Sequence, residues 1–387
     1  MRSVSIIGIG ETRMGRFPDR SIRDMILEAG TKAINDSGID KKSIEAVYLG
    51  NFDGQQLCGQ GHMGPLVSEV LDLGNIPTVR TEGACASGSL AFRMGLTAVM
   101  SGMYDIVLVG GVEKMTHRAT DDVTEALVSA MDYELEATQG FTFPANFAMM
   151  ANRYFYEYRN VKKEMAMCAV NAHRNASLNP DAQMPKEITL EKALAASPIA
   201  TPLSLFDCSL VTDGAAFLVL ATTEIAKKIK KHRVVEVIGS GHAGDNITLF
   251  SKKAITSFSA AKLAAKQAYN QANLKPADID FAEVHDCFTI TQIINIEDLG
   301  FAEPGYGADL VAEGGIALEG KKPINSSGGL KAKGHPIGAT GLSQIFEVVT
   351  QLRGDAGQRQ LKKADIGLTH NLGGTAATCV INIFRGL

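Results

Sequence analysis

The chain has 387 residues, more than one hydrophobic core usually supports, so two or three domains or one large duplicated fold are expected. Apolar residues make up 45% and charged residues 21% of the chain, which excludes a disordered or fibrous protein. The net charge of −4 provides no positive field that would attract nucleic acid or an anionic membrane.

The first predicted element is a strand at residues 4–10 (VSIIGIG), with no signal-peptide pattern before it. Apolar residues at helical spacing from Ile22 to Ala33 predict an amphipathic helix that ends at Gly38, and a second strand follows at 44–51. No apolar stretch reaches the roughly 18 residues of a membrane helix. The six cysteines show no paired spacing, so we expect a cytoplasmic protein with reduced thiols and no metal site.

Cys85 stands where a short strand at residues 76–80 turns into a buried helix over 90–100. Unpaired N–H groups and the positive end of the helix dipole stabilise a thiolate at such a position. Cys85 is therefore a candidate nucleophile. The alternative interpretation is an inert buried cysteine.

The order of elements repeats in the second part of the chain. Residues 235–241 (VEVIGSG) match the first strand, and the later counterparts are a helix at 259–273, a strand at 279–286, a helix at 337–353 and a strand at 365–371. Strand–helix units of this kind predict parallel sheets covered by helices. We predict an N-terminal half over 1–117, an inserted loop region over 118–233 and a C-terminal half over 234–387.

Three further segments of the second half carry chemistry. The glycine-rich loop 326–341 (SSGGLKAKGHPIGATG) holds His335 between Gly334 and Pro336, which suits a positioned base or an oxyanion donor. His335 precedes the long helix of the second half, as Cys85 precedes that of the first half, so we expect the two residues to lie close together. The segments 285–288 (HDCF) and 370–375 (HNLGGT) each follow a strand. Taken alone, Cys287 and His285 could equally be structural.

With these four motifs, the sequence resembles the thiolase family over its full length. Cys85-Ala-Ser and Gly-His335-Pro are similar to two of its motifs. The segments 285–288 (HDCF) and 371–373 (NLG) depart from the common Asn-Glu-Ala-Phe and Cys-x-Gly patterns. They resemble the variant shared by sterol-carrier-protein-type thiolases and their archaeal relatives.

The resemblance implies the thiolase fold, an α/β fold with two duplicated βαβαβαββ halves in a layered α-β-α-β-α structure and a loop-domain insertion. It also implies an acetyl-CoA C-acetyltransferase that condenses two acetyl-CoA to acetoacetyl-CoA and CoA by a ping-pong Claisen mechanism through acyl-Cys85. His335 would take the proton of Cys85, and Cys287 would remove the α-proton of the second substrate. One oxyanion would be held by the backbone N–H groups of Cys85 and Gly373, and the other by His335 and His285.

The predicted substrate contacts are Phe143, Phe147, Ser326, Gly328 and Asn371. We expect residues 141–147 (FTFPANF) to form a lid over the pantetheine arm, although these aromatics could equally be core of the insertion. Coenzyme A arrives with the substrates, so no separate cofactor is expected. The resemblance implies a homodimer or homotetramer and a supply of acetoacetyl-CoA for mevalonate synthesis. It also implies hydroxymethylglutaryl-CoA synthase and a small zinc-ribbon/OB-fold protein as partners.

Other functions stay open at this point. A thiolase of the same kind could degrade longer 3-oxoacyl-CoA substrates. Decarboxylating ketoacyl synthases and hydroxymethylglutaryl-CoA synthase also use a cysteine in this fold, but Cys287 and the Gly-His335-Pro loop speak against both. A non-catalytic acyl-CoA-binding or scaffold protein would lack the nucleophile, and Cys85 is present.

Overall fold

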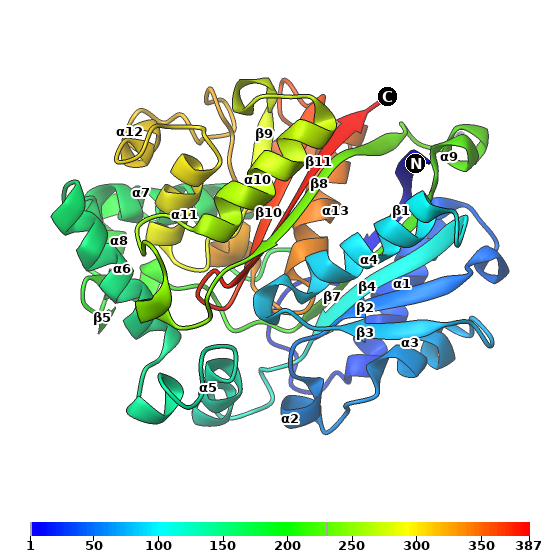
Figure 1. Cartoon of the computed structure of the whole chain (residues 1–387), viewed down its shortest axis with the longest axis horizontal. Helices are drawn as coiled ribbons and strands as arrows, with labels where there is room; N and C mark the ends of the chain where they lie inside the picture. The colour runs from blue at the N-terminus through cyan, green and yellow to red at the C-terminus, as the bar shows by residue number, and fades with distance from the viewer. Residues whose placement is uncertain (1, 230) are drawn as a thin grey trace.

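The computed structural model describes residues 2–229 and 231–387. In this part of the chain, nine strands form one sheet in the order β3-β2-β4-β7-β1-β8-β11-β10-β9. The strands are β1 (Val4–Glu11), β2 (Ala46–Gly50), β3 (Thr78–Thr81), β4 (Ile106–Glu113), β7 (Gly214–Thr222), β8 (Val235–Gly244), β9 (Phe281–Val284), β10 (Ile366–Gly373) and β11 (Thr378–Gly386). The paired residues between β1 and β8 are Ser5 with Glu236 and Ile6 with Val235. The sheet therefore consists of an N-terminal and a C-terminal part that meet along a short seam (Figure 1).

The two parts are related as a duplication. The neighbours β4-β7-β1 on one side of the seam correspond to β10-β11-β8 on the other. A parallel bridge between Ala282 and Ile324 takes the place of the β2–β3 pairing in the second half. The predicted duplication is confirmed, but the sheets are mixed. The pairs of β2 with β3 and β4 and of β9 with β10 are parallel, whereas β7 and β11 run antiparallel to their neighbours.

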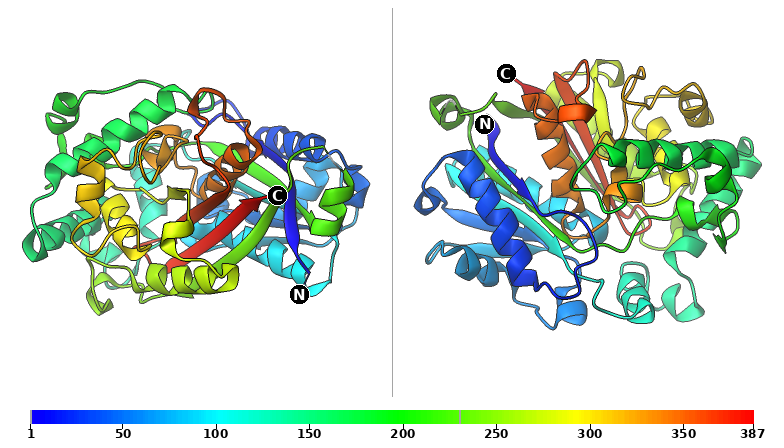
Figure 2. Two further views of the ribbon diagram at one scale, coloured as in Figure 1. Left: turned by 90° about the horizontal axis from the view of Figure 1, so that it is seen from above. Right: turned by 180° about the vertical axis from the view of Figure 1, so that it is seen from behind.

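The helices lie in three layers around the two parts of the sheet. α1 (Ile22–Ser37) and α3 (Met63–Leu71) pack on the outer face of the N-terminal part, and α10 (Ser259–Ala272) packs on the C-terminal part. α4 (Ser87–Ser101) and α13 (Thr340–Arg353) pack against each other in the middle. The view from behind shows α1 outside and α13 at the centre (Figure 2). The predicted layer order α-β-α-β-α is thereby confirmed.

Glycines in the first strand of each half let the outer helix approach closely. A Cβ atom built on Gly10 would lie 2.4 Å from the carbonyl oxygen of Ala29, and one on Gly241 would lie 1.9 Å from that of Ala264. The glycines of the repeated strand motif are therefore needed for packing of strand against helix.

We expect Gly241→Ala to lower the free energy of unfolding by about 3 kcal/mol, because the added methyl group meets helix backbone that has no rotamer with which to move away. Urea denaturation measures this change. Gly244→Ala in the same strand is the control, because the added Cβ atom would lie 3.6 Å from its nearest neighbour, an ordinary contact distance. Gly59→Ala is unsuitable as a control, because the φ of 70° at Gly59 would itself strain an alanine. A Gly241→Ala protein as stable as Gly244→Ala would contradict the packing argument.

The inserted region contains α5 (Thr120–Val128), α6 (Phe143–Glu157), α7 (Lys162–Ser177), α8 (Leu190–Leu194) and the short strands β5 (Pro198–Ala200) and β6 (Leu203–Ser204). The predicted end of this insertion at residue 233 is wrong. β7 lies inside the predicted range, yet it pairs with β1 and β4 in the sheet. Its apolar run from Ala215 to Ala221 is fully buried, so it belongs to the core of the N-terminal half. α9 (Thr223–Ile229) follows it.

The other helices of the described chain are α2 (Gly54–Cys58), α11 (Thr289–Asp298) and α12 (Gly307–Ala312). Across residues 2–229 and 231–387, we find no helix with the length and apolar character of a membrane span.

Candidate active site

Cys85 lies in a 3₁₀ turn, Ala84–Ala86, between β3 and α4. Ala84, just before it, has a φ of 50°, a left-handed conformation that costs energy for a residue with a Cβ atom. The Ser87 hydroxyl stabilises the turn, since it accepts from the N–H of Gly83 (3.0 Å) and donates to the carbonyl of Ala84 (2.6 Å). This local strain presents the half-buried Cys85 side chain to a cavity.

The structure brings Cys85, His285 and His335 together. One sulfur or ring nitrogen atom from each lies within 4.8 Å of the other two. The imidazole rings of His285 and His335 meet edge to face, with their centroids 5.2 Å apart. His285 follows β9, and His335 stands in the loop before α13. The duplicated loops therefore meet at one point, as the sequence predicted for Cys85 and His335.

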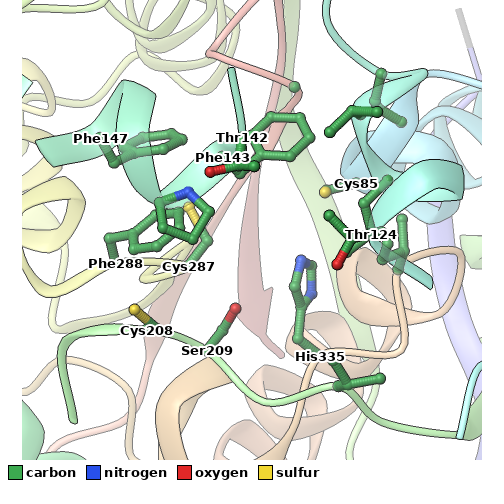
Figure 3. A pocket seen from close by; sticks show the side chains of 18 of the residues that line it. Cys85, Thr124, Thr142, Phe143, Phe147, Cys208, Ser209, Cys287, Phe288 and His335 are labelled. Carbon is green, nitrogen blue, oxygen red and sulfur yellow. The ribbon is translucent and has the colours of Figure 1, made fainter. Parts of the chain in front are cut away.

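These three residues and Cys287 line one cavity of about 230 Å³. Figure 3 shows Cys287 beside Phe147 and Phe288 on one side and Cys85 on the other, with His335 below them. Most of the remaining wall is apolar and includes Phe52, Met115, Leu127, Val128, Phe143 and Ile337. Such a wall excludes water and suits a thioester with a slender arm.

Burial sets the protonation of these groups. It raises the pKa of Cys85 to about 12, although a hydrogen bond from the backbone of Gly374 opposes the rise. It also raises the pKa of Cys287, and the neighbouring Cys85 adds to that rise. Burial lowers the pKa of His335 to about 3 and that of His285 well below its usual value, to which the charge of a protonated His335 would contribute. The resting site therefore holds two thiols and two neutral imidazoles.

This result differs from two expectations about the cysteines. The place of Cys85 before α4 predicts a thiolate, and the role of base implied for Cys287 requires a pKa near neutrality. Loss of water around both sulfur atoms outweighs the helix dipole, because burial disfavours the charged form. Each thiol must therefore lose its proton to a partner during the reaction.

The backbone donor nearest to Cys85 is Gly374, whereas the sequence predicted Gly373. Gly374 lines the cavity, and its N–H hydrogen-bonds the thiol of Cys85. Gly373 is the last residue of β10 and pairs with Thr378. A Cβ atom on Gly373 would lie 2.2 Å from the carbonyl oxygen of Gly83, so Gly373 is a packing position. Gly374, and not Gly373, therefore offers a backbone N–H to the sulfur of Cys85.

Three predicted substrate contacts do not line the cavity. Ser326 is 1% exposed, and its hydroxyl lies 3.1 Å from Oε1 of Glu283 and 3.0 Å from Oε1 of Glu347. Gly328 has a φ of 103° and lies against Ala176, so it shapes the glycine-rich loop. Neither residue lines the cavity, and their assignment to substrate binding is wrong.

Asn371 is fully buried as well. Its side-chain Nδ2 lies 3.0 Å from the carbonyl oxygen of Cys85 and 3.0 Å from Nδ1 of His285. Its assignment to substrate binding is also wrong, because both hydrogens of the amide are used to connect two residues of the site.

Phe143 and Phe147, in the first turns of α6, do line the cavity. Phe147 is 1% exposed, and its ring stacks on Phe288 with the centroids 4.5 Å apart. It is therefore core of the insertion as well as cavity wall. Phe143 is half-buried and remains the predicted contact to the pantetheine arm.

We expect Phe143→Ala to raise KM for acetyl-CoA about tenfold with little change in kcat, because lost apolar contact on the order of 1.4 kcal/mol weakens binding of substrate and transition state alike. Steady-state kinetics measure this split, and Tyr156→Ala on the exposed face of the same helix is the control. An unchanged KM would show that α6 does not cover the substrate.

Glu113, at the end of β4, connects the two halves of the site through hydrogen bonds. The sequence does not predict this residue as part of the site. One carboxylate oxygen accepts from the N–H of Phe52 (2.8 Å) and of Gly338 (3.0 Å). The other accepts from the amide of Asn51 (2.9 Å) and the N–H of Asp53. Burial raises the pKa of Glu113 to about 7, although these N–H donors oppose the rise. The only sequence signal was a glutamate directly after an apolar strand.

We expect Glu113→Gln to lower the free energy of unfolding by about 3 kcal/mol in mildly acidic solution, since the amide NH₂ group would face N–H donors and leave them without an acceptor. Because folding raises the pKa of Glu113, this loss should become smaller as the pH rises toward 7. Thermal and urea denaturation measure this loss. The exposed Glu125→Gln should change stability by less than about 0.5 kcal/mol. Equal stability of the two variants would contradict the role of the carboxylate.

Comparisons with known proteins identify the family of the chain. The thiolase N-terminal domain model matches residues 4–224, and the thiolase C-terminal domain-like model matches residues 241–386. The acetyl-CoA acetyltransferase of Methanothermobacter thermautotrophicus is 46% identical over 99% of this chain and 100% of its own. That of Methanocaldococcus jannaschii is 47% identical over 99% of both chains. The solved Ltp2-ChsH2(DUF35) aldolase superposes with a TM-score of 0.86 at 25% identity, covering 99% of this chain and 98% of its own.

The predicted fold and the predicted enzyme class, an acyltransferase, are confirmed by these matches. Both domain models are found in the expected order, and together they cover nearly the whole chain. The chain belongs to the thiolase family.

Proposed function

We propose that this chain is an acetyl-CoA C-acetyltransferase, which condenses two acetyl-CoA to acetoacetyl-CoA and CoA by a ping-pong mechanism. The observation that carries the proposal is the pair of cysteines, Cys85 and Cys287, that face one apolar cavity with two neutral histidines beside them. The identity of 46% and 47% to two acetyl-CoA acetyltransferases over almost the full length supports the choice of substrate.

In the first half-reaction, His335 takes the proton of Cys85, and the thiolate attacks the thioester carbonyl carbon. The backbone N–H groups of Cys85 and Gly374 stabilise the oxyanion. The bond between the carbonyl carbon and the sulfur of CoA then breaks. Cys287 gives its proton to the departing CoA thiolate, so that an imidazolium at His335 and a thiolate at Cys287 remain beside acetyl-Cys85.

This proton transfer explains how a thiol with a raised pKa becomes a base. The Cys287 thiolate is formed only when a positive charge on His335 is present, and opposite charges nearby favour each other. In the second half-reaction, Cys287 takes the α-proton of a second acetyl-CoA, while His285 and the protonated His335 donate to its thioester oxygen. The carbanion attacks acetyl-Cys85, the carbon–sulfur bond breaks, and His335 returns its proton to Cys85.

Assays of both directions test this proposal. The purified protein should release CoA from acetyl-CoA, form acetoacetyl-CoA, and cleave acetoacetyl-CoA with added CoA. We expect kcat/KM to be highest for acetoacetyl-CoA among 3-oxoacyl-CoA substrates of increasing chain length. A higher value for a longer substrate would favour the degradative thiolase. Absence of turnover with all of them would favour the non-catalytic acyl-CoA-binding protein.

The cellular setting is a further part of the proposal. We propose that the enzyme is a cytoplasmic homodimer or homotetramer that supplies acetoacetyl-CoA for mevalonate synthesis, together with hydroxymethylglutaryl-CoA synthase and a small zinc-ribbon/OB-fold protein. This part rests on the resemblance of the sequence to archaeal thiolases. Size-exclusion chromatography with light scattering tests the assembly, and co-purification from cells tests the partners.

A further inference from the structure

The ring of His335 is held by a chain of hydrogen bonds that leads away from the cavity. Nδ1 of His335 lies 2.6 Å from the hydroxyl of Thr340, which is 2% exposed, and this hydroxyl donates to the carbonyl oxygen of Pro336 at 3.0 Å. A threonine hydroxyl has one hydrogen. The carbonyl oxygen of Pro336 can only accept, so we assign the hydroxyl hydrogen to it. With this assignment the hydroxyl accepts from His335, and the proton of the neutral ring stands on Nδ1.

The ring of His285 is also held through its Nδ1 atom, but here Nδ1 accepts a hydrogen bond. Its Nδ1 lies 3.0 Å from Nδ2 of Asn371, and the same Nδ2 lies 3.0 Å from the carbonyl oxygen of Cys85. A carbonyl oxygen only accepts, so the atom facing it must be the NH₂ group and not the amide oxygen. Nδ1 of His285 therefore accepts the other N–H of Asn371, and the proton of this ring stands on Nε2.

We propose that Thr340 and Asn371 are positioning residues that hold His335 and His285 in opposite tautomers, so that the cavity receives one bare ring nitrogen and one N–H donor. The bare Nε2 of His335 can take the proton of Cys85. The Nε2–H of His285 can donate to a thioester oxygen. The proposal rests on the proposed function for the meaning of these two roles, but the tautomers themselves do not depend on the substrate.

The opposite tautomers divide the work between two chemically identical side chains. With both protons on Nε2, Cys85 would have no base within reach. With both on Nδ1, the enolate oxygen would have no donor from His285. Asn371 also ties the donor to the turn of Cys85, since its amide bonds the backbone carbonyl of the nucleophile. Fixing the tautomer of a catalytic histidine through its second nitrogen is a general requirement of such sites.

Nitrogen-15 solid-state NMR of the enzyme with labelled histidine tests the tautomers directly. The chain has 8 histidines, and spectra of His335→Gln and His285→Gln identify the two signals by their loss. At neutral pH without substrate, we expect a protonated Nδ1 for His335 and a protonated Nε2 for His285. The reverse assignment for either ring would overturn the proposal, even if no variant of Thr340 or Asn371 folds.

Variants then test what holds the tautomers. Thr340→Val keeps the shape but removes the hydroxyl, and we expect acylation of Cys85 to fall about 100-fold through loss of the oriented base. Thr340→Ser keeps the hydroxyl and should restore the rate and the NMR signal. Asn371→Asp offers only acceptors, so the proton of His285 should move to Nδ1. Exchange of the acetyl-CoA α-protons should then fall more than acylation does.

A purely structural role would give another pattern. In Asn371→Asp both half-reactions would fall equally, Thr340→Ser would not rescue Thr340→Val, and the tautomers would stay as in the unaltered enzyme. Any of these results would contradict the proposal. If acetyl-CoA proves not to be the substrate, the NMR result stands, and the half-reactions are measured with the thioester that the enzyme accepts. Failure of the proposed function is thus distinguishable from failure of this inference.

Discussion

Replacing Cys85 with alanine should lower kcat/KM for condensation and for thiolysis alike by about 10⁴-fold or more, because every turnover passes through a thioester on this sulfur. The fold should survive, since Cys85 is only half-buried and alanine adds no atom to the strained turn. Steady-state assays in both directions and a thermal denaturation curve measure the two effects.

Cys208→Ala is the matched control. Cys208 lines the same cavity, and burial raises its pKa to about 11. It takes part in no step of the proposed mechanism. We expect this variant to keep its activity within about threefold, a change in barrier well below the 1.36 kcal/mol that corresponds to tenfold. A Cys85→Ala protein that retained thiolysis would contradict the acyl-enzyme.

Replacing Cys287 with alanine should separate the two half-reactions. Condensation and exchange of the α-protons of acetyl-CoA should fall by about 10³-fold or more, as expected when a general base is lost. Acylation of Cys85 should fall much less, because the backbone donors and His335 are unaltered and a solvent proton can reach the departing CoA. Deuterium exchange into acetyl-CoA and a single-turnover acylation assay measure the two steps. Full condensation activity would rule out Cys287 as the base.

Much of this site could be predicted from the sequence. Its residues lie near the ends of strands and helices, and the internal repeat shows where these strands and helices are. Cys85 and His335 precede the central helix of their halves, and two-fold related elements bring them to one seam. The glycine-rich loop 326–341, which holds His335, is one of these segments. Gly10 and Gly241 show that other glycines serve the packing of strands against outer helices.

The errors have physical reasons. The sequence predicts the segment of β7 to be part of the insertion because it lies next to it in the chain. Only its pairing with β1 and β4 shows that it belongs to the sheet. Gly373 and Gly374 are adjacent, and the sequence does not reveal which N–H points to Cys85. The sequence predicts Asn371 at the end of a strand, where ligand-binding residues are common, but it lies inside β10 and its amide is used within the protein.

The protonation states of the cysteines could not be predicted from the sequence either. The place of Cys85 before a helix argued for a thiolate, whereas burial raises its pKa to about 12. In the proposed mechanism, protons pass between Cys85, His335 and Cys287 only after a thioester has entered the cavity. The chemistry thus depends on proton transfer within the cavity and not on a preformed ion.

The division of work between the two cysteines is the central claim, and mass spectrometry of the Cys287→Ala protein after incubation with acetyl-CoA tests it most directly. We predict that one acetyl group per chain accumulates and maps to the peptide that contains Cys85, since condensation can no longer remove it. An acetyl group on any other residue, or none at all while the unaltered enzyme condenses acetyl-CoA, would contradict it.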